Sequence, residues 1–162
     1  MTASIEYKIS TEFLDQGKDI PIGSIVKYML ECFPDSCFSK NWGKDNDFRW
    51  SDELIIVNAY EVFRYEILYW CGCGNVEGSD DAVRYFLTAM NGYDERDDIL
   101  EINFGTKSIY ENPLLLCLAY TMDAAGFTEH GTGIGGAWLT DKGKIYLWIL
   151  NKMKEIGGYD LT

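Results

Sequence analysis

The spacing of apolar residues along the chain is that of a mainly helical protein. Apolar side chains recur every three or four positions, the period of a helix with one buried face, in four segments: residues 22–33, 80–90, 114–125 and 140–156. Residues 51–70 are apolar on almost every side. Because a helix of that kind is normally buried, we expect it to be the central helix of the fold.

Polar residues, glycine and proline mark where these helices begin and end. Ser51 and Thr140 are good N-terminal caps, and Asn112 before Pro113 combines a cap with proline in the first turn. Between helices the pattern predicts short strands and loops: a strand at 4–9, an aromatic-rich loop at 34–50, a short strand at 99–104 within an acidic, irregular stretch, and a hairpin at 127–139 around a glycine-rich turn.

Length and composition limit the number of domains. With 162 residues and 47% hydrophobic residues, the chain can bury a sizeable core, which excludes a disordered protein. We expect an N-terminal segment over residues 1–50, containing one helix and the aromatic loop. We expect residues 51–162 to form a helical domain that is one compact unit.

The charge of the chain is strongly negative and unevenly distributed. The formal net charge is −12, and residues 77–101 hold eight acidic side chains against two basic ones. The acidic residues are Glu77, Asp80, Asp81, Asp94, Glu95, Asp97, Asp98 and Glu101. A field of this sign repels nucleic-acid phosphates and anionic lipid, and attracts basic protein surfaces. The alternative is a solvated face that only keeps the protein soluble.

Neither a membrane span nor a signal peptide is predicted. No run of 18 apolar residues occurs, and the first residues lack a basic region followed by an apolar core. We therefore expect a cytoplasmic protein with reduced cysteines. Cys32, Cys37, Cys71 and Cys73 form two close pairs, but their spacings of four and one residues do not fit a structural zinc site. Zinc binding by these four thiols stays open, and no metal or other cofactor is expected.

No catalytic constellation is predicted. Residues 131–136 fit the spacing G-x-G-x-x-G, but a strand follows them where a dinucleotide site needs a helix. His130 beside Glu129 has no nucleophile pattern nearby. Asp97 and Asp98 lie in a stretch that lacks the alternating oxygen ligands and central glycine of a calcium loop. We expect a protein that is not an enzyme.

Residues 114–150 resemble winged-helix regulators of the MarR and PadR kind. Gly126-Phe127 matches the end of the helix before the wing, and Leu139-Thr140-Asp141-Lys142-Gly143 matches the start of the helix after it. The resemblance implies a C-terminal helix–β-hairpin–helix unit. It also implies an alternative function, a dimeric DNA-binding regulator that pairs through its apolar helices. Residues 114–123 contain no Lys or Arg, which argues against direct nucleic-acid binding by this helix.

A second resemblance, over residues 51–156, is to small uncharacterised phage and prophage proteins. It is carried by the Trp70–Gly74 and Gly126–Thr140 motifs and implies a phage origin and a bacterial host cytosol. We therefore expect a protein-binding module, an inhibitor of a host nucleic-acid-binding or defence protein with a basic surface, whose acidic segment imitates the phosphates of DNA. Trp42 and Trp50 are expected to add aromatic contacts, unless their loop is simply pinned to the core.

Overall fold

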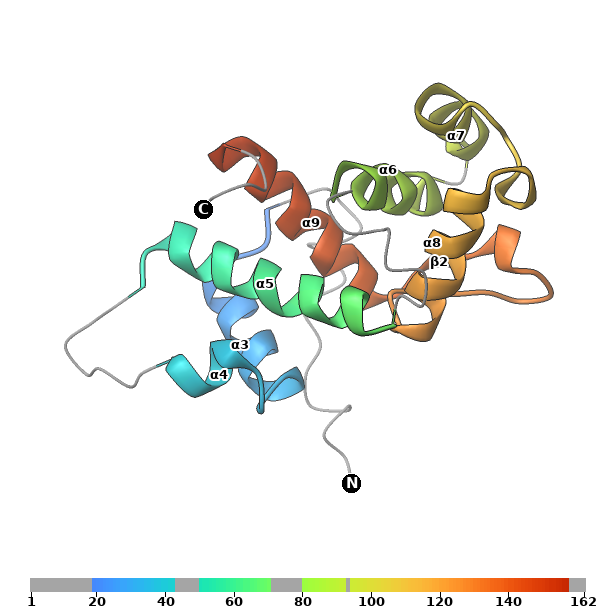
Figure 1. Cartoon of the computed structure of the whole chain (residues 1–162). Coiled ribbons are helices and arrows are strands. Elements are labelled where there is room, and N and C mark those ends of the chain that lie inside the picture. The colour runs from blue at the N-terminus through green and yellow to red at the C-terminus, as the bar shows by residue number, and fades with distance from the viewer. Residues whose placement is uncertain (1–18, 43–49, 71–79, 93, 158–162) are drawn as a thin grey trace. The chain divides into compact units, whose positions relative to one another are not determined.

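The protein is mainly helical, as the apolar spacing predicts. The computed structural model in Figure 1 describes residues 19–42, 50–70, 80–92 and 94–157. This part contains α3 (Ile22–Cys32), α4 (Cys37–Asn41), α5 (Asp52–Trp70), α6 (Asp80–Asn91), α7 (Arg96–Phe104), α8 (Pro113–Ala124) and α9 (Asp141–Ile156), the 3₁₀ turns η1 (Ile109–Glu111) and η2 (Ile134–Gly136), and the strands β1 (Thr128–Glu129) and β2 (Trp138–Leu139). The strand predicted at 4–9 lies outside the described residues.

The chain divides into two compact units. One consists of residues 1–63 together with 152–162, and the other of residues 64–151. Both boundaries fall inside helices, within α5 and within α9. The acidic segment, the hairpin and the start of the last helix all belong to the second unit, which we call unit 2.

The first unit is held by an aromatic cluster between α3 and α5. The rings of Tyr28 and Phe63 are stacked with centroids 6.4 Å apart, and Phe33 meets Phe63 edge-on at 5.3 Å. The prediction that residues 34–50 are all loop was wrong, because they include α4. The Ser36 side chain caps this helix by accepting a hydrogen bond from the backbone N–H of Ser39, a local interaction that periodicity does not reveal.

An ion pair joins the two chain segments of the first unit. Lys152 Nζ lies 3.0 Å from Asp19 Oδ1 and 3.3 Å from Glu155 Oε2. The hydrogen bond to the Asp19 carboxylate raises the pKa of Lys152 above its ordinary value, and Glu155 adds to the shift. Asp19 is exposed, so the pair is solvated and contributes little to stability.

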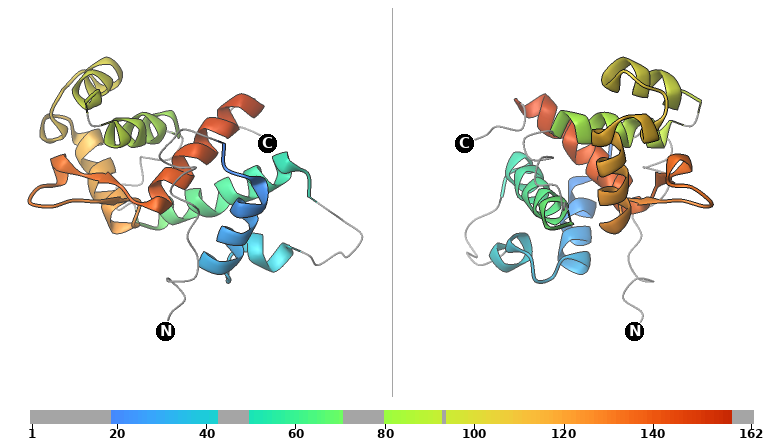
Figure 2. Two further views of the ribbon diagram at one scale, coloured as in Figure 1. Left: turned by 180° about the vertical axis from the view of Figure 1, so that it is seen from behind. Right: turned by 45° about the vertical axis from the view of Figure 1, so that its right-hand side comes forward.

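Unit 2 contains the predicted hairpin between two helices. β1 and β2 are antiparallel, with Thr128 opposite Leu139 and Glu129 opposite Trp138. Gly126, with φ of 84°, ends α8 in the left-handed conformation and turns the chain into β1. In Figure 2, α6, α8 and the hairpin surround the start of α9. The largest fully buried side chains of this core include Phe86, Leu118, Phe127 and Tyr146.

The strand predicted at 99–104 does not form, and those residues belong to α7. Leu100, Ile102 and Phe104 alternate with polar residues, which is the pattern of a half-buried strand. Helix forms instead because acidic residues occupy the first turn, at the positive end of the helix dipole, and Gly105 ends the helix in the left-handed conformation with φ of 76°. In the helix, Leu100 is buried against α6 and Ile102 points to solvent.

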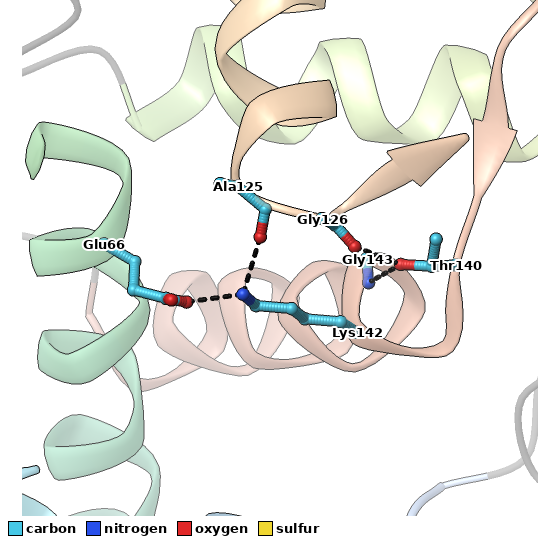
Figure 3. A network of polar contacts seen from close by, with 6 residues as sticks. All are labelled: Glu66, Ala125, Gly126, Thr140, Lys142 and Gly143. Atoms are coloured by element: carbon cyan, nitrogen blue, oxygen red, sulfur yellow. Dashed lines mark hydrogen bonds and ion pairs between the residues drawn. The ribbon is translucent and has the colours of Figure 1, made fainter. Parts of the chain in front are cut away.

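A polar network fixes the first turn of α9 within unit 2 (Figure 3). Lys142 Nζ pairs with Glu66 Oε2 at 2.6 Å and donates a hydrogen bond to the carbonyl of Ala125, also at 2.6 Å. The Thr140 hydroxyl donates to the carbonyl of Gly126 at 2.7 Å and accepts from the N–H of Gly143 at 3.2 Å. The network therefore connects α9 to the end of α8 and to the last turns of α5.

We expect Lys142→Met to lower the free energy of unfolding by roughly 1–2 kcal/mol, because it leaves the half-buried Glu66 carboxylate and the Ala125 carbonyl without their charged partner. Glu66→Gln should cost less, since the polar amide oxygen can still lie against the Lys142 ammonium group although the ion pair is lost. The double variant measures the coupling by urea denaturation, and we expect about 1 kcal/mol of non-additivity. Strictly additive effects would contradict a direct interaction between the two side chains.

Candidate functional site

The acidic segment is organised around α7, which lies beside α6 in Figures 1 and 2. Leu100 is 1% exposed, Ile99 and Phe104 are half-buried, and Arg96 is half-buried on the same face. These positions follow the three- and four-residue spacing of one helix face, so α7 buries one side against α6 and exposes the other. The sequence of α7 therefore determines which of its charges reach solvent.

Arg96, the basic residue of α7, points inward. Its guanidinium donates to the carbonyls of Ala89 and Met90 at the end of α6, at 3.4 and 3.3 Å. It also donates to Gly135 at 3.1 Å and to Ala137 at 2.5 Å, on either side of the turn before β2. The five fixed donors of arginine suit such a set of carbonyls. The positive charge of Arg96 is therefore hydrogen-bonded to backbone oxygens and does not neutralise the carboxylates on the outer face of α7.

Five carboxylates are exposed on α7 and on the turn before it: Asp94, Glu95, Asp97, Asp98 and Glu101. Glu101 pairs with Lys107 at 3.5 Å, but both side chains are more than half exposed, so solvent screens this pair. Among the described residues no cation lies within ion-pair distance of the other four. We call these five residues the α7 carboxylates, and together they form a strongly negative local surface.

Ile102 is a large apolar side chain among these carboxylates, and it is not one of the residues that the sequence pattern indicates. It is 82% exposed, the highest value among the exposed large hydrophobic residues of the described chain. It follows Glu101 directly and lies one helical turn after Asp98. The only sequence signal for its exposure is its phase in a helix, which the strand-like alternation of residues 99–104 conceals.

Of the other acidic residues of the segment, Asp80 and Asp81 lie at the start of α6 and not on α7. Asp80 is 9% exposed at the start of α6. Asp81 lies in the first turn of the same helix and pairs with Arg84 at 3.4 Å. Glu77 lies outside the described residues. The candidate surface considered below consists of the α7 carboxylates.

Trp42 and Trp50 belong to the first unit and pack with each other and with Phe38. The ring centroids of Trp42 and Trp50 are 5.3 Å apart, and Phe38, which is 1% exposed, lies 6.0 Å from Trp42 and 5.2 Å from Trp50. Both tryptophans are half-buried. Both rings pack against the buried Phe38, and each keeps an exposed portion.

Some of the residues considered for metal binding and catalysis lie in the described part of the chain. No group of three or more potential metal ligands occurs in the part of the chain that the structure describes. Cys32 and Cys37 are exposed at the end of α3 and the start of α4, while Cys71 and Cys73 lie outside the described residues. His130 Nε2 lies 3.6 Å from Asp123 Oδ1, a contact that joins the hairpin to α8.

The basic residues near the C-terminus are largely engaged within the protein. Lys142 is paired with Glu66, and Lys152 with Asp19 and Glu155. α8 carries no basic residue, and its exposed positions include Leu114 and Tyr120. Lys142 and Lys152 are therefore engaged in ion pairs that a phosphate backbone would have to replace.

Among the described helices, none combines the length and the apolar character needed to cross a membrane. Comparison of the chain with protein-family models, with curated proteins and with solved structures found no match.

Proposed function

We propose that this protein is a non-enzymatic protein-binding module whose contact surface is formed by the α7 carboxylates, and that its partner is a protein with a basic surface. The observation that carries the proposal is the inward orientation of Arg96. Because its guanidinium is bound by four carbonyls, the five exposed carboxylates form a negative surface without an internal counter-charge on α7. Such a surface attracts cationic protein and repels phosphate.

In the phage setting that the resemblance implies, the partner is a host nucleic-acid-binding or defence protein, and the carboxylates occupy its phosphate-binding surface. The segment α8–β1–η2–β2–α9 is, in this proposal, a winged-helix-like unit used as a scaffold. Its first helix lacks Lys and Arg, which favours a scaffold over a DNA-reading helix. The half-buried Trp42 and Trp50 are a secondary contact in the other unit.

Charge reversal tests the proposal. The variant Asp97→Lys/Asp98→Lys should weaken capture of a partner from bacterial lysate at least about tenfold, because two attractive charges become repulsive. The tagged protein is used with and without nuclease, and bound proteins are eluted with NaCl from about 50 to about 500 mM. A specific partner should survive nuclease, elute at moderate salt and be absent from the variant. Because Asp97 and Asp98 occupy the first turn of α7, circular dichroism must first show that the variant keeps its helix content.

The matched control is Glu31→Lys/Asp35→Lys, which makes the same change of net charge in the first unit at two exposed acidic positions. This control should retain the partner. If both double variants lose it equally, the effect is one of overall charge and the α7 surface is not the site. Recovery of DNA with the protein, or loss of every bound protein on nuclease treatment, would favour the winged-helix regulator instead.

A further inference from the structure

The exposed face of α7 has an apolar residue at its centre. Asp98 and Ile102 lie on the side of the helix opposite the buried Leu100, with Glu101 beside them, whereas Asp97 lies three residues before Leu100, at the edge of the buried face. Single exposed apolar side chains are common on protein surfaces, but this isoleucine is 82% exposed and has the exposed carboxylates Asp98 and Glu101 next to it on the same helix. This combination, an apolar residue inside a charged rim, is the arrangement found at the centre of protein interfaces.

We propose that the α7 face binds a cationic amphipathic segment of a partner protein, with Ile102 as its apolar anchor. This inference rests on the proposed function and specifies the partner's chemistry. Charge complementarity selects the occupant: the carboxylates require a segment rich in lysine or arginine, and Ile102 requires an apolar side chain within it. A nucleic acid fails the first requirement, and a purely polar basic tail fails the second.

The consequence is that affinity has two separable parts. The carboxylates contribute a part that falls as salt is added, because the charges on the exposed face are screened over about 10 Å at 0.1 M salt. Ile102 contributes a part that salt leaves unchanged, because it arises from burial of apolar surface. A surface that only imitates the phosphates of DNA has the first part alone.

Two synthetic peptides of equal length and charge separate these parts. One carries lysines with leucines at helical spacing, and the other has glutamine in place of each leucine. Binding to the full-length protein is followed by isothermal titration calorimetry at low and high salt. The leucine peptide should bind more tightly, and Ile102→Ala should reduce that binding roughly tenfold to fiftyfold while leaving the glutamine peptide unaffected.

The variant is suited to the test because alanine favours helix more than isoleucine does, so Ile102→Ala should not unfold the exposed face of α7. Leu114→Ala is the matched control, an exposed aliphatic residue of α8 that is 37% accessible. It should leave both peptides bound as before. Circular dichroism spectra of both variants check that the helices are retained.

The possible results distinguish the two proposals. If neither peptide binds, the α7 surface does not bind cations and the proposed function fails as well. If both peptides bind equally and Ile102→Ala changes nothing, the surface is purely electrostatic, so the anchor is wrong and the proposed function stands. If the preference for leucine depends on Leu114 and not on Ile102, the apolar contact lies on α8 and the inference is overturned.

Discussion

Replacing Gly143 with alanine should destabilise the protein by roughly 3 kcal/mol, although helix propensity alone predicts a gain of about 1 kcal/mol. Gly143 lies in the first turn of α9 and is buried. A Cβ atom there would overlap the carbonyl oxygen of Phe127. That carbonyl cannot easily move, because it accepts a hydrogen bond from the N–H of Thr140 at 3.1 Å and Phe127 is fully buried.

Thermal unfolding followed by circular dichroism measures the effect, and we expect a midpoint about 5–10 °C below that of the wild type. Gly23→Ala is the matched control. Gly23 is also a helical glycine, near the start of α3, but a Cβ atom added there would meet no atom within 4 Å. This control should be neutral or slightly stabilising. Equal unfolding midpoints for the two variants would mean that helix propensity, and not the Phe127 carbonyl, determines the effect of alanine at position 143 on stability.

Arg96→Lys should lower the free energy of unfolding by roughly 2–3 kcal/mol even though it keeps the charge. The guanidinium binds the carbonyls of Ala89 and Met90 on one side and of Gly135 and Ala137 on the other. An ammonium group has three donors and no planar fork, so it cannot reach all four oxygens together. Half-buried carbonyls that lose this donor lower the free energy of unfolding.

Urea denaturation of Arg96→Lys is compared with that of Arg84→Lys, the same substitution one helix earlier. Arg84 pairs with Asp81, whose side chain is half exposed, and lies over the ring of Tyr85. We expect this control to lose less than about 1 kcal/mol. If Arg96→Lys unfolds at the same urea concentration as the wild type, the hydrogen bonds from Arg96 to the four carbonyls do not hold α7 to the hairpin.

Much of the helical framework could be predicted from the sequence, because apolar residues at helical spacing over a long segment indicate a helix. The helices ending at Cys32, Trp70 and Ala124 are long and rich in apolar residues, and Ser51 and Asn112 cap the last two of them. The short elements could not be predicted. α4 depends on one cap at Ser36, and α7 depends on acidic residues in its first turn outweighing the alternation of Leu100, Ile102 and Phe104.

The candidate surface was predictable in charge but not in extent. Counting charges identifies the acidic segment, yet it treats Asp80 and Asp98 alike, and only the packing of α6 separates the buried carboxylate from the exposed one. Counting also lets Arg96 offset one negative charge of the segment. The sequence does not show that its side chain points inward, away from the exposed carboxylates. The exposure of Ile102 follows from the helical phase of α7, which the mistaken strand concealed.

The inward turn of Arg96 has a kinetic consequence. Apart from the exposed Lys107 beside Glu101, the described residues place no cation against the five carboxylates. Their negative field therefore attracts an oppositely charged partner before contact and orients it on approach. Association of such pairs can exceed the usual 10⁵–10⁷ M⁻¹s⁻¹ by about tenfold or more at low salt. The lifetime of the complex would then be governed by a different feature, the apolar contact at Ile102, so the rates of capture and of release would be controlled separately.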